Sequence, residues 1–286
     1  NEGVNVNFGT EFEFYLFRLD ADGNATNIPY DNAKYMDIAP LDRGENVRRE
    51  ICLTLIEMGI RAESSHHEDG PGQNEIDFRY ADAMRAADNA ITFPSVVRTV
   101  AMRNGLWADF TPKPIADESG NGMHINLSLA MPLSEGARDA FMAGLMEHIC
   151  EITVFLNPLD ASYARLGEHK APRYVTWSPE NRSQLIRIPA AKGEYERLEL
   201  RSPDPAGNPY LAFALILAAG ADGIRRNLVA PPPTNVNLFT ADASITGKLR
   251  QLPRTRAEAA KIARESAFVR SVVPAGIIDA YTLDLD

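Results

Sequence analysis

Residues 9–17, Gly-Thr-Glu-Phe-Glu-Phe-Tyr-Leu-Phe, form the stretch of sequence that decides the fold. Phe12 and Phe14 alternate with Glu11 and Glu13, and this period of two is typical of a β-strand with one buried face. Side chains two positions apart on a strand point to the same side, so both glutamates leave from one face of the sheet. The sequence therefore predicts a strand that carries paired carboxylates.

The elements that follow do not alternate as regular βαβ units. Apolar residues at helical spacing predict long helices over residues 47–58, 82–104, 134–155 and 208–226. Strands are expected over residues 60–64 and 75–80, on the two sides of a turn at Asp69-Gly-Pro-Gly. This order favours an α+β fold with a curved antiparallel sheet flanked by helices.

Composition excludes several classes of protein. The net charge of -10 offers no basic surface to phosphate backbones, so we expect no nucleic-acid partner. The longest apolar run, from Tyr210 to Gly220, is about half as long as a bilayer span requires, so we expect no membrane partner. Cys52 and Cys150 lack CxxC spacing, which favours reduced thiols in a cytoplasmic enzyme.

The Glu11 and Glu13 pair is a candidate metal site, because hard divalent cations prefer oxygen ligands. Taken alone, the pair favours a simpler interpretation, two solvated glutamates on an exposed strand face. Other parts of the sequence must decide between the two.

A second candidate is Arg197-Leu-Glu-Leu-Arg201, where Arg197, Glu199 and Arg201 share one strand face. Arginines that hold phosphate oxygens around a metal-binding carboxylate would suit a metal-bound phosphate. The alternative is a ladder of surface salt bridges. Arg182 and Arg187 bring more guanidinium groups onto adjacent strands, which in an acidic protein indicates an anionic ligand.

A third candidate is Gly120-Asn-Gly-Met-His124, a glycine-rich turn that delivers a histidine to the start of a strand. Imidazole is a common ligand of divalent metals and would complete a site otherwise made of carboxylates. A lone histidine is more often structural. The remaining histidines have weaker claims: His66, His67, His148 and His169.

Five spaced motifs resemble, in order, the signatures of type I glutamine synthetases. They are Gly9-Thr-Glu-Phe-Glu-Phe14, His66-His-Glu-Asp-Gly-Pro-Gly-Gln-Asn-Glu75, Gly120-Asn-Gly-Met-His124, Asn181-Arg-Ser183 and Arg197-Leu-Glu-Leu-Arg-Ser-Pro-Asp-Pro-Ala-Gly-Asn-Pro-Tyr210. The resemblance runs from about residue 8 to 228. It implies one catalytic domain over residues 1–286 with the glutamine synthetase/guanido kinase-like fold.

The resemblance also implies roles for individual residues. Two Mg²⁺ or Mn²⁺ ions are expected, one held by Glu11, His124 and Glu199 and the other by Glu13, Glu68 and Glu75. The nucleotide would contact Tyr35, Glu63, Tyr80, Ser128, Arg182, Arg187 and Arg197. The amino-acid substrate would contact Ser119, Gly120, Arg165, Arg201 and Glu75. Catalytic roles are expected for Arg165, Arg182 and the residue at position 170, here Lys170.

In this family the γ-phosphate of ATP is transferred to the γ-carboxylate of glutamate, and ammonia attacks the acyl phosphate to give glutamine. Family members assemble as dodecamers of two stacked hexameric rings, so a homo-oligomer is expected. The family also has a small N-terminal β-grasp domain with no counterpart in this sequence. Either the native protein carries this domain or it lacks it, and the first residue, Asn1 rather than Met, favours the first alternative.

The sequence departs from the family pattern at four positions. Lys170 stands where a glutamate normally accepts a proton from ammonium, and Glu168 is the alternative base. Ser119 replaces an asparagine, Asn126 replaces a histidine, and Phe239 replaces a tyrosine that some relatives adenylylate. These departures leave two alternatives open, a γ-glutamyl-amine ligase that uses another amine and a structural or regulatory pseudoenzyme.

Overall fold

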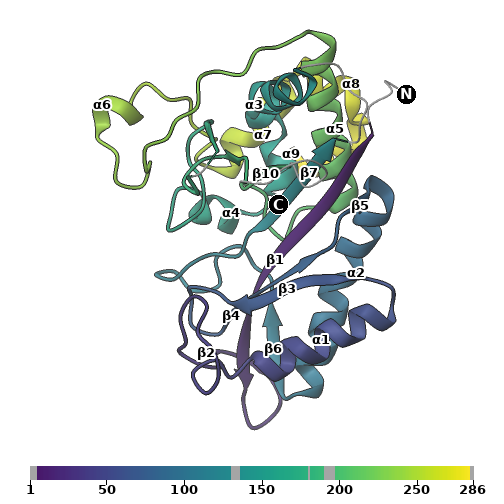
Figure 1. Ribbon diagram of the computed structural model, residues 1–286, viewed down its shortest axis with the longest axis vertical. Coiled ribbons are helices and arrows are strands. Elements are labelled where there is room, and N and C mark those ends of the chain that lie inside the picture. The colour runs from purple at the N-terminus through teal and green to yellow at the C-terminus, as the bar shows by residue number, and fades with distance from the viewer. Residues whose placement is uncertain (1–4, 130–135, 180, 190–196, 284–286) are drawn as a thin grey trace.

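The computed structural model describes residues 5–129, 136–179, 181–189 and 197–283 (Figure 1). Strand β1 (Val6–Leu19) is the axis of its sheet and pairs with neighbours along both edges. The strand order is β3 (Ala62–His67), β4 (Gln73–Phe78), β1, β7 (Met123–Leu129), β10 (Leu198–Leu200), β9 (Ile186–Arg187) and β8 (Trp177–Ser178). Three short strands also pair with β1: β2 (Ala25–Pro29), β5 (Ala81–Asp82) and β6 (Leu106–Asp109).

The expected α+β fold is confirmed, with one difference in strand direction. Strands β8 and β9 run parallel, whereas the other pairs formed by the described strands are antiparallel. The parallel pair lies at the edge beyond β10. The strands that carry the motif residues therefore belong to the antiparallel part of the sheet.

Both faces of β1 are covered, so the expected half-exposed strand is wrong for its polar face. Phe12 and Phe14 belong to the hydrophobic core, but Glu13 and Tyr15 on the opposite face are also only 9% and 0% exposed. Loops cover this second face, and the Tyr15 hydroxyl donates a 2.6 Å hydrogen bond to the carbonyl of Ser119. The carboxylates of β1 are thus held in a partly desolvated interior.

The long helices form where the apolar spacing predicts them. They are α1 (Glu45–Glu57), α2 (Ala83–Arg103), α3 (Ala137–Leu156) and α5 (Pro209–Arg225). The expected start of the third helix at residue 134 lies outside the described residues. The N-caps of α2 and α5 are Asp82 and Asn208, whose side chains accept backbone N–H groups of the first turn.

Helices cover the sheet in two groups (Figure 1). Helices α1 and α2 lie beside β3, β4 and β6, and Phe93 of α2 packs against Phe12 and Phe78 with ring centroids 5.1 and 4.8 Å apart. Helices α3 and α5 form the second group and touch at Gly144 and Gly223. A Cβ on Gly144 would lie 2.2 Å from the carbonyl oxygen of Ala219, so this close crossing requires glycine.

Shorter helices complete the chain: α4 (Asp160–Arg165), α6 (Ala243–Thr246), α7 (Arg256–Glu265), α8 (Ala267–Val272) and α9 (Ala275–Thr282). Among the helices that the structure describes, none combines the length and the apolar character needed to cross a bilayer. Cys52 and Cys150 are both free thiols, in agreement with their spacing.

Candidate active site

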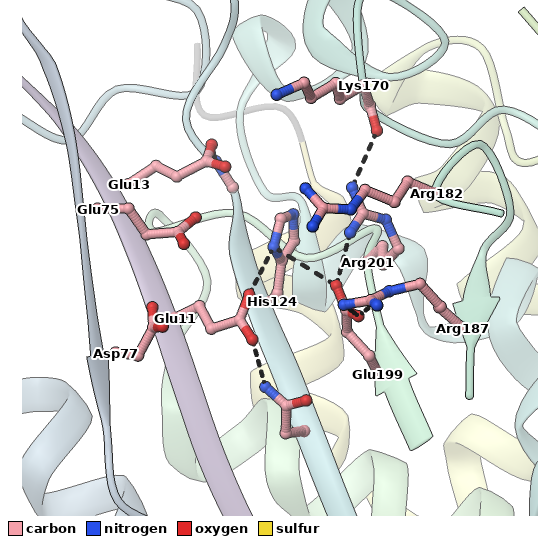
Figure 2. Close-up of polar contacts among 12 residues, drawn as sticks. Glu11, Glu13, Glu75, Asp77, His124, Lys170, Arg182, Arg187, Glu199 and Arg201 are labelled. Carbon is pink, nitrogen blue, oxygen red and sulfur yellow. Dashed lines mark hydrogen bonds and ion pairs between the residues drawn. The ribbon is translucent and has the colours of Figure 1, made fainter. Parts of the chain in front are cut away.

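Strand register brings the motif residues into one row across the sheet, which Figure 2 shows in close-up. The directly paired positions are Glu13 with Glu75, Glu11 with His124, and Glu199 with Arg187. These residues come from β4, β1, β7, β10 and β9, which are distant in sequence but adjacent in the sheet. The row has carboxylates at one end, an imidazole in the middle and guanidinium groups at the other end.

One group of potential metal ligands surrounds His124. Ligand atoms of Glu11, Glu75 and His124 all lie within 4.8 Å of one another. Nδ1 of His124 is 3.1 Å from Oε2 of Glu11 and 3.8 Å from Oε1 of Glu199. The three residues that the resemblance assigns to one ion, Glu11, His124 and Glu199, are therefore neighbours.

A second group lies one strand further along. Ligand atoms of His66, Glu68 and Glu75 also lie within 4.8 Å of one another, so Glu75 is common to both groups. Nε2 of His66 is 3.2 Å from Glu68 and 3.5 Å from Glu75. Glu13 joins this region differently, because its Oε2 accepts the N–H of Gly122 at 2.6 Å.

Two residues of this region were not among the predicted ligands. His66 lies directly opposite Glu75 in the β3–β4 pair, a relation that follows from the tight reversal between the strands. Asp77 lies opposite Glu11 and points toward the same cluster (Figure 2). Its position two residues after Glu75 on one strand was the signal that could have identified it.

The clustered carboxylates repel one another strongly. Burial, together with the charges of Asp77, Glu13 and other carboxylates, raises the pKa of Glu75 well above its usual value. Burial and the charge of Glu11 raise the pKa of Asp77 to about 7. For Glu11 burial acts in the same direction, but hydrogen bonds from His124 and Asn126 outweigh it and lower the pKa to about 2.

These donors fit divalent cations. Carboxylate oxygens and one imidazole nitrogen per group suit Mg²⁺ or Mn²⁺, and a cation would relieve the repulsion that raises the pKa of Glu75. The solvated-glutamate alternative for Glu11 and Glu13 does not hold, because Glu13 is 9% exposed and the side chain of Glu11 only 18% exposed.

The arginines lie across the row from the carboxylates. Arg187 and Arg201 hold the two oxygens of the fully buried Glu199, each at 2.5 Å. Arg197 donates from Nε to Oδ1 of Asn126 at 2.9 Å, and Nδ2 of Asn126 donates to Glu11 at 2.8 Å. Asn126 thus connects the arginine side to the carboxylate side of the row.

Arg165 and Arg182 extend this positive region. Burial lowers the pKa of Arg165, whose Nη1 donates to the carbonyl of Ser202 at 2.8 Å. Arg182 donates to the hydroxyl of Tyr35 at 3.2 Å, which brings a loop before α1 to the site. The salt-bridge ladder predicted as an alternative is present around Glu199, but it is buried rather than on the surface.

Two cavities adjoin the row. The smaller, of about 20 Å³, is lined by Glu13, Glu68, Asp69, Gln73, Ser119, Gly120, His124, Arg165, Glu168, His169, Lys170 and Ala171. The larger, of about 330 Å³, is lined by Gly9, Thr10, Glu11, Glu63, Asp77, Phe78, Arg79, Tyr80, Asn126, Ser128 and Arg197. Expected nucleotide contacts at Glu63, Tyr80 and Ser128 therefore share one cavity, whereas Tyr35 lies beside His66 and Lys170.

Gly120 allows close approach at the smaller cavity. A Cβ on it would lie 2.3 Å from the carbonyl oxygen of Pro112 and 2.9 Å from Cγ of Arg165, so a side chain would displace one of them. Ser119 and Gly120 both turn their carbonyl groups to neighbouring side chains, to Tyr15 and Gln73 respectively.

Lys170 closes one side of the smaller cavity. Its Nζ is 2.6 Å from Asp69 and 3.7 Å from Glu68, and lies 3.9 Å from the centroid of the Tyr35 ring. Burial opposes its charge, but the charge of Glu68 and the hydrogen bond with Asp69 raise its pKa above the usual value. Lys170 is therefore a stable cation at neutral pH and unsuited to act as a base there.

The family model described as the catalytic domain of glutamine synthetase matches residues 1–283. The chain is 44% identical to the glutamine synthetase of Methanosarcina mazei, covering 98% of this chain and 66% of that protein. The chain belongs to the glutamine synthetase family. It is also 44% identical to the enzyme of Thermus thermophilus, with 94% of this chain and 64% of that protein covered.

Solved structures agree with this family membership. The GmaS/ADP complex superposes with a TM-score of 0.85 at 32% identity, covering 98% of this chain and 68% of that one. The Plasmodium falciparum glutamine synthetase, at 23% identity, has the same fold, with a TM-score of 0.82 over 99% of this chain and 72% of that one. The chain spans about two thirds of the length of the curated relatives it matches.

Proposed function

We propose that this chain carries the catalytic site of an ATP-dependent ligase that joins ammonia to the γ-carboxylate of L-glutamate through γ-glutamyl phosphate, giving L-glutamine. The observation that carries the proposal is the row of buried carboxylates, one imidazole and several arginines across β4, β1, β7, β10 and β9. Membership of the glutamine synthetase family supports it. We also propose that residues 1–286 act as one catalytic domain.

Two Mg²⁺ or Mn²⁺ ions would bind to the carboxylate end of this row. The first would be held by Glu11, His124 and Glu199, and the second by Glu13, Glu68 and Glu75. When bound, the ions neutralise the charge that develops on the transferred phosphoryl group. His66 and Asp77, which lie among these ligands, would orient them.

The nucleotide would occupy the larger cavity, with Glu63, Tyr80, Ser128 and Arg197 as contacts. Arg182 and Arg187, together with Tyr35, would bind on the phosphate side. Planar guanidinium groups bind phosphate oxygens in pairs, so these arginines would hold and orient the terminal phosphate for attack by the carboxylate.

Glutamate would bind at the smaller cavity, which Ser119, Gly120 and Arg165 line, and Arg201 and Glu75 would contact it from outside that lining. Two arginines provide charge for its carboxylate groups, and Glu75 for its ammonium group. The narrowness of this cavity supports exclusion of water, which would otherwise hydrolyse the acyl phosphate.

Removal of a proton from ammonium requires a base other than Lys170, whose pKa is raised by its acidic neighbours. We assign this role to Glu168, because it lines the same cavity as Glu68 and Lys170. For the complete protein we further propose a cytoplasmic dodecamer of two stacked hexameric rings.

The proposed reaction can be tested with glutamate labelled with ¹⁸O in its γ-carboxylate and the full-length protein, Mg²⁺ and ATP. We expect one labelled oxygen in the released phosphate, because the carboxylate oxygen stays with phosphorus when the amide forms. Phosphate release should require both glutamate and ammonia. Release of unlabelled phosphate, or turnover only with an organic amine such as methylamine, would overturn the proposal.

A further inference from the structure

The loop at residues 166–171, between α4 and β8, closes over the smaller cavity. Within it, the N–H of Glu168 donates to the carbonyl of Arg165 at 3.1 Å, and the N–H of Ala171 donates to the carbonyl of Glu168 at 2.9 Å. These short-range contacts give the loop a defined shape. Leu166 holds the start of the loop in the hydrophobic core, whereas Glu168 and His169 at its tip are exposed.

Lys170 connects the tip of the loop to other parts of the site. Its carbonyl accepts Nη2 of Arg201 at 3.3 Å on one side, while its ammonium extends toward the carboxylate side of the site (Figure 2). There the ammonium meets a cage formed by Asp69, Glu68 and the ring of Tyr35. One residue thus connects the loop to Arg201 just after β10, to the β3–β4 turn and to the segment before α1.

The cage has the chemistry that binds an alkylammonium group. Asp69 supplies a charge-assisted hydrogen bond at 2.6 Å, and the Tyr35 ring offers its electron-rich face at 3.9 Å. A neutral side chain of the same length would lose both attractions. Because the Lys170 side chain is still 40% exposed, solvent screens the pair and keeps the attachment reversible.

With Lys170 in the cage, the cavity that it shares with Arg165 and Gly120 is narrow but open to solvent, with about 20 Å³ of space. Glu168, His169 and Lys170 line it from the loop, and Glu68 and Asp69 line it from the β3–β4 turn. An amino acid that contacts Arg165 and Gly120 would share this space with the Lys170–Asp69 contact, and displacement of the loop would widen it.

We propose that Lys170 is a positioning residue that latches the 166–171 loop over the amino-acid site through Asp69 and Tyr35. The latch rests on the proposed function for the identity of the amino acid as glutamate. In the latched form Glu168 lines the cavity together with Glu13 and Glu68, so closure also delivers the proposed base. Release of the latch controls when glutamate reaches the site.

Hydrogen–deuterium exchange on the full-length oligomer with Mg²⁺ tests the latch without any substrate. The variants are Lys170→Met, which keeps length without charge, and Asp69→Asn, which changes the other partner. Lys248→Met is the matched control, because Lys248 is exposed and lies outside the loop. Loss of one screened charge-assisted bond should speed exchange of the loop amides about fivefold in both variants.

The control should exchange as the wild type does, and the double variant should be no faster than either single variant, since both remove one contact. Unchanged loop exchange in Lys170→Met and Asp69→Asn overturns the latch, whatever the reaction. Fully additive effects in the double variant also overturn it, because the two residues would then act separately.

Stopped-flow measurement of glutamate binding connects the latch to the reaction. We expect Lys170→Met to raise the association rate of glutamate about fivefold, and to lower kcat because Glu168 is held less well. Faster loop exchange with an unchanged association rate overturns control of access. Faster exchange with no glutamate binding by any form, wild type included, supports the latch and removes the proposed function instead.

Discussion

The active-site row on the sheet and the loop that covers it differ in how they are held. Residues of the row are fixed by strand register and are mostly buried, as for Glu199 at 0% exposure. The loop is buried at Leu166 and Ala171, but its tip is exposed at Glu168 and His169, and the Lys170–Asp69 pair is partly exposed. The row also matches the family motifs at every expected metal ligand, whereas the loop departs from them at Lys170.

This difference separates two kinds of function. Metal binding and phosphoryl transfer need ligands placed within tenths of an ångström, and a hydrogen-bonded sheet provides such precision. In the proposed function, substrate access and proton transfer need a part that moves, and the exposed tip of the loop at Glu168 and His169 provides it. Changes in the row should therefore affect stability and chemistry together, and changes in the loop should affect access with little effect on stability.

Glu199→Gln should produce the largest effect. Both carboxylate oxygens of Glu199 are held by arginines, so the variant leaves Arg187 and Arg201 without a compensating charge in the interior. We expect the free energy of unfolding to fall by about 3–5 kcal/mol. Activity should fall roughly a thousandfold, since the residue is also a proposed metal ligand.

Chemical denaturation and steady-state assays check this, with Glu265→Gln, an exposed change in α7, as the control. The control should stay within about 0.5 kcal/mol of the wild type. If Glu199→Gln were no less stable than Lys170→Met, the distinction between a rigid row and a movable loop would be lost.

How far the sequence predicts this row depends on the range of each signal. The period of two in β1 and the turn before Glu75 are local, so Glu11, Glu13 and Glu75 could be identified directly. The pairing of Glu11 with His124 joins residues 113 positions apart, and spacing alone does not specify that register. The family resemblance predicts His124 as a metal ligand, but only the structure shows that it lies opposite Glu11.

The sequence carries weaker signals, or none, for other features of the site. Asp77 is two residues after Glu75 and follows from the strand period, whereas His66 also needs the β3–β4 register. The burial of the polar face of β1 depends on loops that arrive from elsewhere in the chain. The contact between Lys170 and Asp69 depends on the conformations of two loops, for which hydrophobic periodicity carries no information.

Asp77→Asn should give an intermediate effect that depends on pH and metal. The folded-state pKa of Asp77, about 7, is higher than that of an unfolded aspartate, so the metal-free folded state binds the proton more tightly. Its contribution to stability is present at low pH and is lost as the pH rises through about 7. Asparagine cannot ionise and should remove this loss.

Denaturation in EDTA at pH 5 and pH 8 measures the effect. The variant should gain stability relative to the wild type at pH 8 and little at pH 5, and saturating Mg²⁺ should reduce the difference. Asp279→Asn, an exposed change in α9, should show no such dependence. An equal change in the free energy of unfolding at both pH values would mean that burial and the charge of Glu11 do not destabilise ionised Asp77.

Substitutions of Tyr35 should change activity least. Tyr35 contacts both the row, through Arg182, and the loop, through Lys170. Its hydroxyl accepts a hydrogen bond from Arg182, and its ring faces the ammonium of Lys170. Tyr35→Phe removes the first contact and keeps the second, so we expect the KM for ATP to rise about threefold with unchanged exchange of the 166–171 loop. Tyr35→Leu removes both and should also speed loop exchange. If the phenylalanine variant speeds loop exchange as much as the leucine variant, the hydroxyl and not the ring face holds the loop, and the row and the loop are coupled through Arg182.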